Sequence, residues 1–249
     1  MKKVISLVAA LSMALSLCAC GGTNDADTGA EKLTMATNAT FPPYEFYENE
    51  TIVGIDAEIA AKIAEKIGME LEIVDTEFGS IIAGVQSGKY DIGMAGMTVT
   101  EERLQSVNFT TSYATGIQSI IVPEGSEIKT LDDLAGKKIG VQQDTTGHIY
   151  SADEFGDEMV TPFNKGTDAV AALVAGKVDC VIIDNQPAKS FVEVNEGLAI
   201  LDTDYAVEDY AIAIAKENTE LLEKVNGALE ELIADGTVKT IIDKYISAE

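Results

Sequence analysis

The sequence predicts an α/β protein of two lobes, each a sheet flanked by helices, and three observations carry this expectation. Apolar segments with strand spacing alternate with segments of helical spacing along most of the chain. Residues 85–94 (VQSGKYDIGM) recur as residues 173–182 (LVAGKVDCVI), so one helix–strand unit occurs twice. Two extended segments, 117–122 and 210–215, indicate that the chain crosses into a second lobe and returns through a hinge.

Both copies of the repeat predict the same local structure. An apolar helix ends at a glycine, Gly88 or Gly176, and an aspartate then precedes a buried strand. Polar residues follow each strand, at 95–98 in the first copy and 184–186 in the second. Open α/β sheets bind ligands beyond the carboxyl ends of their strands. We therefore expect a cleft between the lobes that holds a small ligand.

The remaining elements follow from periodicity and capping. Further strands are expected at 33–37, 71–74, 138–141 and 159–163, and an aromatic loop at 41–47. Asp56 is predicted to cap a helix that ends at Gly68. Thr130 is predicted to cap a short acidic helix that ends at Gly136, and Thr167 is predicted to cap the helix of the second repeat. The other expected helices are a short one at 101–105, one opened by the polar turn 142–147, and two amphipathic C-terminal ones, at 221–232 and ending near Tyr245.

The N-terminus predicts a lipoprotein signal peptide. Two lysines precede an apolar run at 4–17 that is too short to span a bilayer comfortably. Residues 17–21 (LCACG) resemble a signal-peptidase box in which Cys20 receives the lipid, a palmitate-bearing anchor; a box ending at Cys18 and an ordinary secretory signal are the alternatives. Residues 1–19 are then removed, 20–31 form a flexible tether, and the protein is anchored to the outer face of the cell membrane.

Charge and cysteine content exclude several classes of function. The net charge is −25, and removal of Lys2 and Lys3 with the signal makes it −27, which disfavours nucleic acid as a partner. Cys180 lies in an apolar run and is expected to be a buried, inert thiol without a disulfide partner. His148 is the single histidine, so we expect no metal site and no cofactor, and we expect the protein to be monomeric.

Arg103 is the most informative single residue, because every other basic side chain of the chain is a lysine. It follows a strand end and a short polar segment that contains Thr98. A guanidinium presents a planar fork of donors that fits a carboxylate, so these residues predict an anion-binding site. The alternative is a surface arginine paired with Glu101 or Glu102.

These motifs together resemble the family 3 solute-binding proteins, the amino-acid receptors of ABC importers. The resemblance covers nearly the whole chain after the signal and rests on residues 35–46 (MATNATFPPYEF), 54–58 (GIDAE), 95–103 (AGMTVTEER), 140–147 (GVQQDTTG) and 181–185 (VIIDN). It implies a type II periplasmic-binding-protein fold and a binding protein rather than an enzyme. The first lobe would comprise 32–116 and 213–249 and the second 117–212, with hinge strands near 114–120 and 209–214.

The resemblance also implies roles for individual residues. Thr98, Arg103 and the backbone at Gly96 and Met97 would hold the ligand α-carboxylate, with Thr145 and Thr146 adding contacts at a helix N-terminus. Asp184 would bind the α-ammonium group, although its position also suits a helix N-cap. Phe41 and Phe78 would sandwich the ligand side chain. Asn38 stands where many relatives for basic or amide side chains have Asp, which argues against a strongly cationic ligand, and Asp144 and Gln142 are further candidates for setting the preference.

The sequence thus predicts a receptor that closes around a polar L-amino acid and delivers it to the permease subunits of an ABC importer. Two other functions remain as alternatives: an amino-acid-sensing signalling receptor, and a dehydratase on the same fold.

Overall fold

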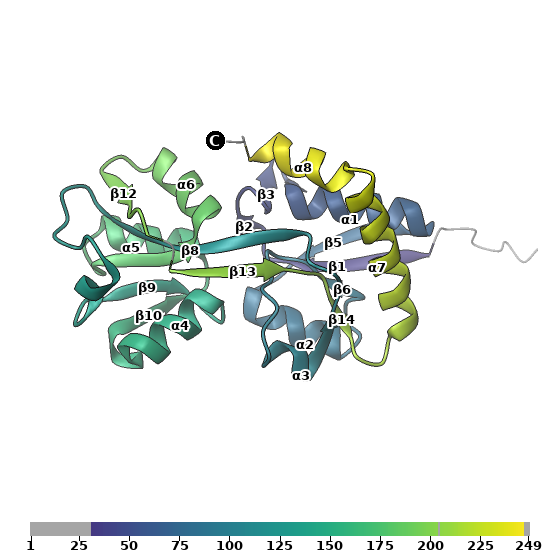
Figure 1. Cartoon of the computed structure of the whole chain (residues 1–249), viewed down its shortest axis with the longest axis horizontal. Helices are drawn as coiled ribbons and strands as arrows, with labels where there is room; N and C mark the ends of the chain where they lie inside the picture. The colour runs from purple at the N-terminus through teal and green to yellow at the C-terminus, as the bar shows by residue number, and fades with distance from the viewer. Residues whose placement is uncertain (1–30, 204, 247–249) are drawn as a thin grey trace, which may run out of the picture.

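Two α/β lobes lie side by side in the computed structural model, which describes residues 31–203 and 205–246 (Figure 1). The predicted signal peptide, Cys20 and the tether up to residue 30 lie outside the described residues. Strands β8 (Ala114–Pro123) and β13 (Ala206–Tyr210) pair antiparallel and run between the lobes (Figure 1). Both predicted hinge ranges overlap these strands, but the second crossing is split, because the chain leaves β13 and resumes as β14 (Ala213–Ala215) in the other sheet.

The first lobe contains a sheet with the strand order β5–β1–β6–β14–β7. Its strands besides β14 are β1 (Lys32–Thr37), β5 (Glu70–Asp75), β6 (Ile92–Gly93) and β7 (Val107–Phe109). The helices around it are α1 (Ile55–Ile67), η1 (Phe78–Ser80), α2 (Ile81–Gln86), α3 (Arg103–Ser106), α7 (Thr219–Ala234) and α8 (Thr237–Tyr245). Helices α1, α7 and α8 gather on one side of the sheet, and α2 and α3 lie on the other (Figure 1).

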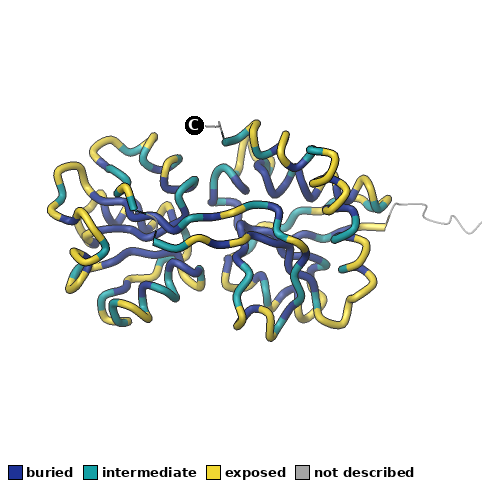
Figure 2. Tube along the Cα trace, viewed as in Figure 1, coloured by how far each residue is buried: buried dark blue, intermediate teal, exposed yellow. Residues whose placement is uncertain are grey.

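The second lobe contains a sheet with the order β10–β9–β11–β8–β12, to which β13 is added through β8. Its other strands are β9 (Ile139–Gln142), β10 (Val160–Phe163), β11 (Cys180–Asp184) and β12 (Leu198–Ile200). The helices are η2 (Leu131–Leu134), α4 (Thr146–Phe155), η3 (Asp157–Met159), α5 (Gly166–Val174) and α6 (Asn185–Val194). In both lobes the central strands are buried and the outer helix faces are exposed (Figure 2).

The sequence repeat is a structural repeat. Helix α2 leads into β6, and α5 leads into β11, with Gly88 and Gly176 in left-handed conformation at φ 72° and 67°. Only glycine adopts this conformation at little steric cost, which explains why the same residue ends both helices.

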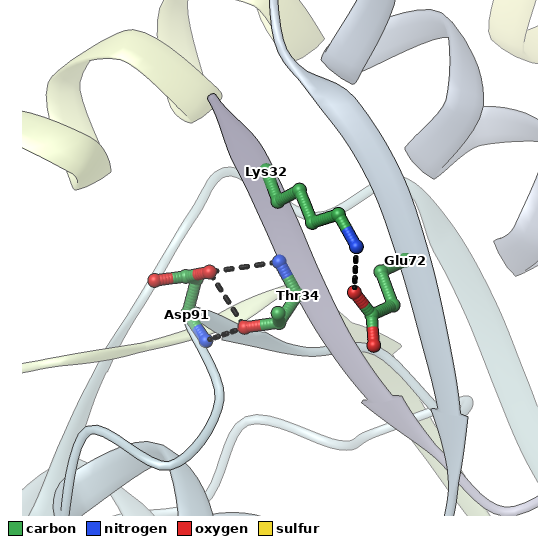
Figure 3. Close-up of polar contacts among 4 residues, drawn as sticks. All are labelled: Lys32, Thr34, Glu72 and Asp91. Carbon is green, nitrogen blue, oxygen red and sulfur yellow. Dashed lines mark hydrogen bonds and ion pairs between the residues drawn. The ribbon is translucent and has the colours of Figure 1, made fainter. Parts of the chain in front are cut away.

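The aspartate of each repeat ties its strand to the neighbouring parallel strand of the same sheet, β1 for β6 and β9 for β11. Asp91 Oδ2 accepts hydrogen bonds from the Thr34 N–H at 2.7 Å and the Thr34 hydroxyl at 2.6 Å, beside an ion pair between Lys32 and Glu72 (Figure 3). Asp179 Oδ2 accepts from the Lys138 N–H at 2.8 Å, immediately before β9. The two copies therefore use the same residue for the same connection.

Three local predictions need correction, whereas others are confirmed. The segment predicted as an aromatic loop folds into a small sheet of β2 (Thr40–Phe41), β3 (Glu45–Glu48) and β4 (Thr51–Val53). Asp56 and Thr167 are not N-caps, because the N-cap residues of α1 and α5 are Gly54 and Lys165, each two residues earlier. Thr130 does cap its helix, through a capping box with Asp133, and Gly68 does end α1.

Candidate ligand-binding site

At the carboxyl ends of the strands lies a cavity that residues of both lobes line. Nine of the ten sequence-predicted site residues line it. They are Asn38, Phe41, Phe78, Gly96, Thr98, Arg103, Thr145, Thr146 and Asp184. Three further residues complete the lining: Glu45, Ala95 and Gln142. Met97 is the exception, since its side chain is fully buried in the core of the first lobe rather than at the cavity.

Arg103 is held in place by the first lobe and is 8% exposed. Its Nη1 donates to the Thr98 carbonyl at 2.8 Å, and its Cζ lies 5.3 Å from the centre of the Phe78 ring. Both contacts fix the plane of the guanidinium. Its Nη2 also donates to the Asp144 carbonyl at 3.1 Å, and the N–H donors that these two bonds leave over are suited to an anion. Burial lowers the pKa of Arg103, opposed chiefly by the negative charge of Glu208. The alternative of a surface ion pair is therefore wrong.

Gly96 allows the Phe41 ring to lie close to the backbone, but its N–H is not free to bind a ligand. Its N–H donates to Asp56 Oδ2 at 2.8 Å, so this donor is already engaged by the protein. Its φ is 52°, and a side chain here would lie 3.0 Å from the Phe41 ring. Glycine therefore lets the aromatic ring and the polar segment 95–98 share one wall of the cavity.

Asp184 stands at the end of β11, buried, with its carboxylate turned toward the hinge strands. Oδ1 accepts from the Tyr210 hydroxyl, and Oδ2 accepts from Gln118 Nε2 at 2.8 Å. It occupies the N-cap position of α6, as its place in the sequence suggested, but its side chain makes no cap hydrogen bond, so its carboxylate is not used for capping. Burial, and then the charge of Glu208, raise the pKa of Asp184 to about 7. A positive charge bound next to this carboxylate would stabilise its ionised form, which burial otherwise disfavours.

The N-terminus of α4 forms another part of the wall. Thr145 is the N-cap, and its Oγ1 accepts from the His148 N–H at 3.3 Å while donating to the Gln142 carbonyl at 2.8 Å. Thr146 is buried beside it, 3.4 Å from Gln118 Nε2. His148 itself does not line the cavity, and its Nδ1 accepts from the Asp144 N–H at 3.2 Å.

Direct contacts join the two lobes across the cavity. Arg103 Nη2 donates to the Asp144 carbonyl at 3.1 Å, and Gln142 Nε2 donates to Asn38 Oδ1 at 3.0 Å. The Asp144 carboxylate lies so close to Gly79 that a side chain there would meet it at 2.1 Å. The two lobes are therefore in contact across the cleft. Asp144 contacts the first lobe at the edge of the cleft and does not line the cavity.

Sequence reasoning missed two lining residues, Glu45 and Ala95, and the polar residues that lie behind the cavity wall. Gln118 Nε2 bridges Asp184 and Glu208, at 2.8 Å from each carboxylate, although the three residues are far apart in sequence. Glu45 lies among the aromatic residues of segment 41–47, and an acidic residue at such a position could have indicated a functional side chain. Tyr210 reaches Asp184 because Gly116 leaves room for it.

No metal site is formed by the described residues, since no group of three or more His, Cys, Asp or Glu side chains there is arranged to hold an ion. Cys180 is free and buried, as predicted, and burial raises the pKa of its thiol to about 12, which disfavours the reactive thiolate. Within 31–203 and 205–246 no helix is long and apolar enough to cross a bilayer.

Comparison with known proteins places these features in context. Residues 33–248 match the family model of bacterial extracellular solute-binding proteins, family 3. The arginine-binding extracellular protein ArtP of Bacillus subtilis is 33% identical over the whole of both chains. The arginine-, lysine-, histidine-binding protein ArtJ of Geobacillus stearothermophilus superposes with a TM-score of 0.84 at 33% identity, over 88% of this chain and 96% of its own. An ancestral arginine-binding protein bound to glutamine has a TM-score of 0.81 at 40% identity, over 87% and 98%.

Proposed function

Because this chain belongs to the family 3 bacterial extracellular solute-binding proteins, we propose that it is the amino-acid receptor of an ABC importer and that its ligand is a cationic L-amino acid, with L-arginine as the first candidate. Membership makes it a binding protein rather than an enzyme and places its work outside the cytoplasm. One observation carries the proposal: Arg103 from one lobe and Asp184 from the other line the same cavity.

This pair matches the two charged groups that all free α-amino acids share. The guanidinium of Arg103, with Thr98 beside it, is suited to the α-carboxylate, and the N-terminus of α4 adds a favourable partial positive charge. The carboxylate of Asp184 is suited to the α-ammonium group. A ligand that lacks either group leaves a buried charged partner without its counter-ion, which costs about 3–5 kcal/mol for a buried pair.

The buried charges support a cationic side chain. Asp184 and Glu208 are both buried within reach of the same amide of Gln118, whereas Arg103 is the single buried arginine. This excess of negative charge favours a ligand with a net positive charge. In the sequence, Asn38 argued against a cationic ligand. Its amide nitrogen donates to the Thr76 carbonyl at 2.7 Å, and its amide oxygen accepts from Gln142. Asn38 is therefore part of the cavity wall and does not determine the charge of the ligand. Phe41 and Phe78 supply apolar faces for the side-chain stem.

Isothermal titration calorimetry with four matched compounds tests the proposal. L-arginine is expected to bind, and L-citrulline, which has a neutral group of similar shape, at least ~10-fold more weakly. Agmatine lacks the carboxylate and Nα-acetyl-L-arginine lacks the ammonium charge, and each is expected to lose at least ~100-fold, about 2.7 kcal/mol.

The outcomes separate the parts of the proposal. Equal binding of L-arginine and agmatine would overturn the role of Arg103 in carboxylate recognition. Tighter binding of L-citrulline or L-glutamine would retain an amino-acid receptor but overturn the cationic ligand class. Absence of binding by all amino acids in a thermal-shift screen would refute the receptor function, since a ligand at 100 times its Kd stabilises the folded state by about 2.7 kcal/mol.

We also propose that Cys20 carries a lipid anchor and that the lobes, divided at 116/117 and 212/213, open about the hinge strands. Mass spectrometry of the membrane fraction tests the first point through an N-terminal diacylglyceryl cysteine at position 20. Small-angle scattering tests the second, because the radius of gyration is expected to fall when L-arginine is added. Delivery to permease subunits, with the receptor acting as a monomer, completes the proposed function.

A further inference from the structure

Two buried carboxyl side chains, Glu45 and Asp56, stand behind the segment 95–98 of the cavity wall. Glu45 begins β3 and lines the cavity, and Asp56 lies in the first turn of α1. They are 1% and 0% exposed. Asp56 Oδ2 accepts from the Gly96 N–H at 2.8 Å and from the Tyr113 hydroxyl at 2.9 Å, so this one oxygen connects α1, the cavity wall and the start of β8.

The other oxygens of this pair have no donor. Both oxygens of Glu45 and Oδ1 of Asp56 are buried without a hydrogen-bond partner among the described residues when both groups are treated as carboxylates. Two carboxylates are only acceptors and cannot bond to each other. A single proton between them changes this, because a protonated carboxyl group donates to its neighbour.

The charged groups that act most strongly on Glu45 within the described residues are negative. These groups are Asp56, Asp184 and Asp75, all acidic, and the hydroxyls of Tyr44 and Tyr113 lie near the pair. Within the described part of the chain, no ion pair involves Glu45 or Asp56. Two buried like charges in contact are strongly unfavourable, so one of the two groups is neutral.

We propose that Glu45 is a protonated carboxylic acid that donates its proton to Asp56 Oδ1, and that it is thereby a positioning residue for the ligand-binding segment 95–98. Glu45 holds one oxygen of Asp56 while Gly96 and Tyr113 hold the other, so the aspartate side chain is fixed from both sides. The Gly96 N–H then has a rigid acceptor, and the segment that presents Thr98 to the cavity keeps its shape.

The electrostatics agree with this assignment of the proton. Burial, and then the charge of Asp56, raise the pKa of Glu45 well above its usual range. Burial raises the pKa of Asp56 only to about 6, because its hydrogen bonds from Gly96, Tyr113 and Glu45 stabilise the ionised form. Near neutral pH the proton therefore resides on Glu45.

Infrared spectroscopy tests the protonation state directly. At about pH 7 the difference spectrum between the wild-type protein and Glu45→Gln is expected to contain the carbonyl stretching band of a protonated carboxylic acid, lost in the variant. Glu48→Gln changes an exposed glutamate of the same strand and is the matched control, which is expected to lose only carboxylate bands. Loss of carboxylate bands alone in Glu45→Gln would overturn the proposal.

The pH dependence of unfolding provides a second test that needs no ligand. The folded protein keeps a proton on Glu45 above pH 4.5, where the unfolded chain releases it. Because unfolding releases this proton, the equilibrium constant for unfolding increases about tenfold for each unit by which the pH rises. The increase ends once the pH exceeds the pKa of Glu45 in the folded state. Glu45→Gln is expected to remove one proton from the uptake on folding. The same pH slope in both proteins would contradict the assignment.

Ligand affinity tests the positioning role, and only this test rests on the proposed function. Glu45→Gln keeps a donor for Asp56 and is expected to bind L-arginine within about threefold of wild type. Glu45→Leu leaves Asp56 Oδ1 without a donor and is expected to bind at least ~10-fold more weakly. Equal affinity of Glu45→Leu and wild type would refute the positioning role. If wild type binds no amino acid, the proposed function fails while the infrared and proton-uptake results still decide on the carboxyl pair.

Discussion

Replacement of Asp184 by asparagine separates ligand recognition from folding. Asp184→Asn keeps the size and planarity of the side chain and retains an oxygen that can accept from the Tyr210 hydroxyl. It removes the negative charge proposed to bind the α-ammonium group. Since breaking a buried charge pair costs about 3–5 kcal/mol, the affinity for L-arginine is expected to fall at least ~150-fold.

The stability of the empty protein is expected to change in the opposite direction. Folding raises the pKa of Asp184 from 3.8 to about 7, so the folded state binds this proton more tightly than the unfolded state. The corresponding stability, about 4 kcal/mol for roughly three pH units, is present below pH 3.8 and is lost as the pH rises toward 7. Asp184→Asn has no such loss. At about pH 8 the empty variant is therefore expected to unfold at the same temperature as wild type or a higher one.

The pH dependence of ligand affinity follows from the same shift. A bound ammonium group favours the ionised form of Asp184, so binding below pH 7 releases a proton. The affinity of wild type is expected to fall by up to about tenfold for each pH unit below 7 and to level off above it. In Asp184→Asn this dependence disappears.

Calorimetric titrations in two buffers of different ionisation enthalpy count the released proton, and differential scanning calorimetry measures the stability. Asp168→Asn is the matched control, because it neutralises an exposed aspartate in the first turn of α5 in the same lobe. Wild-type affinity in Asp184→Asn would refute the role of this carboxylate. A large loss of stability in the empty variant at about pH 8 would refute the electrostatic reasoning.

Four further substitutions test other parts of the structure. Arg103→Lys keeps the charge but loses the planar fork and the bonds to Thr98 and Asp144, so the calorimetric affinity for L-arginine is expected to fall at least ~10-fold; unchanged affinity would contradict bidentate recognition. Gly116→Ala places a methyl group 2.2 Å from the Tyr210 hydroxyl oxygen and is expected to cost about 1–3 kcal/mol in urea unfolding and to weaken binding through Asp184. Gly227→Ala, in α7 with open space around it, should instead stabilise by about 0.5–1 kcal/mol, and equal effects of the two glycine changes would count against the steric argument. Thr130→Ala removes a capping box far from the cavity and is expected to cost about 1 kcal/mol with no change in affinity; weaker binding would argue against the independence of this helix.

Local periodicity and turn chemistry were sufficient for much of the fold. The repeated glycines, Gly88 and Gly176, mark helix ends because left-handed backbone is cheap only for glycine, and this is a property of the residue itself. The strand formers that follow are buried in both lobes. Helix starts were less predictable. Asp56 has the chemistry of an N-cap, but its carboxylate is used instead by Gly96 and Tyr113, which are distant in sequence.

The sequence by itself determined the two α/β lobes, because local patterns of apolar residues mark the strands and their ends. It also indicated nearly all of the cavity lining, because the single arginine and the neighbouring motifs resemble those of a known family. Only the tertiary structure decided how the buried acids are arranged. Gln118 joins Asp184 and Glu208 from segments far apart in the sequence. Glu45 of β3 and Asp56 of α1 are both fully enclosed only once the lobe has folded. The energy of a buried charge depends on which groups surround it in space, and neighbours in the sequence do not specify that environment.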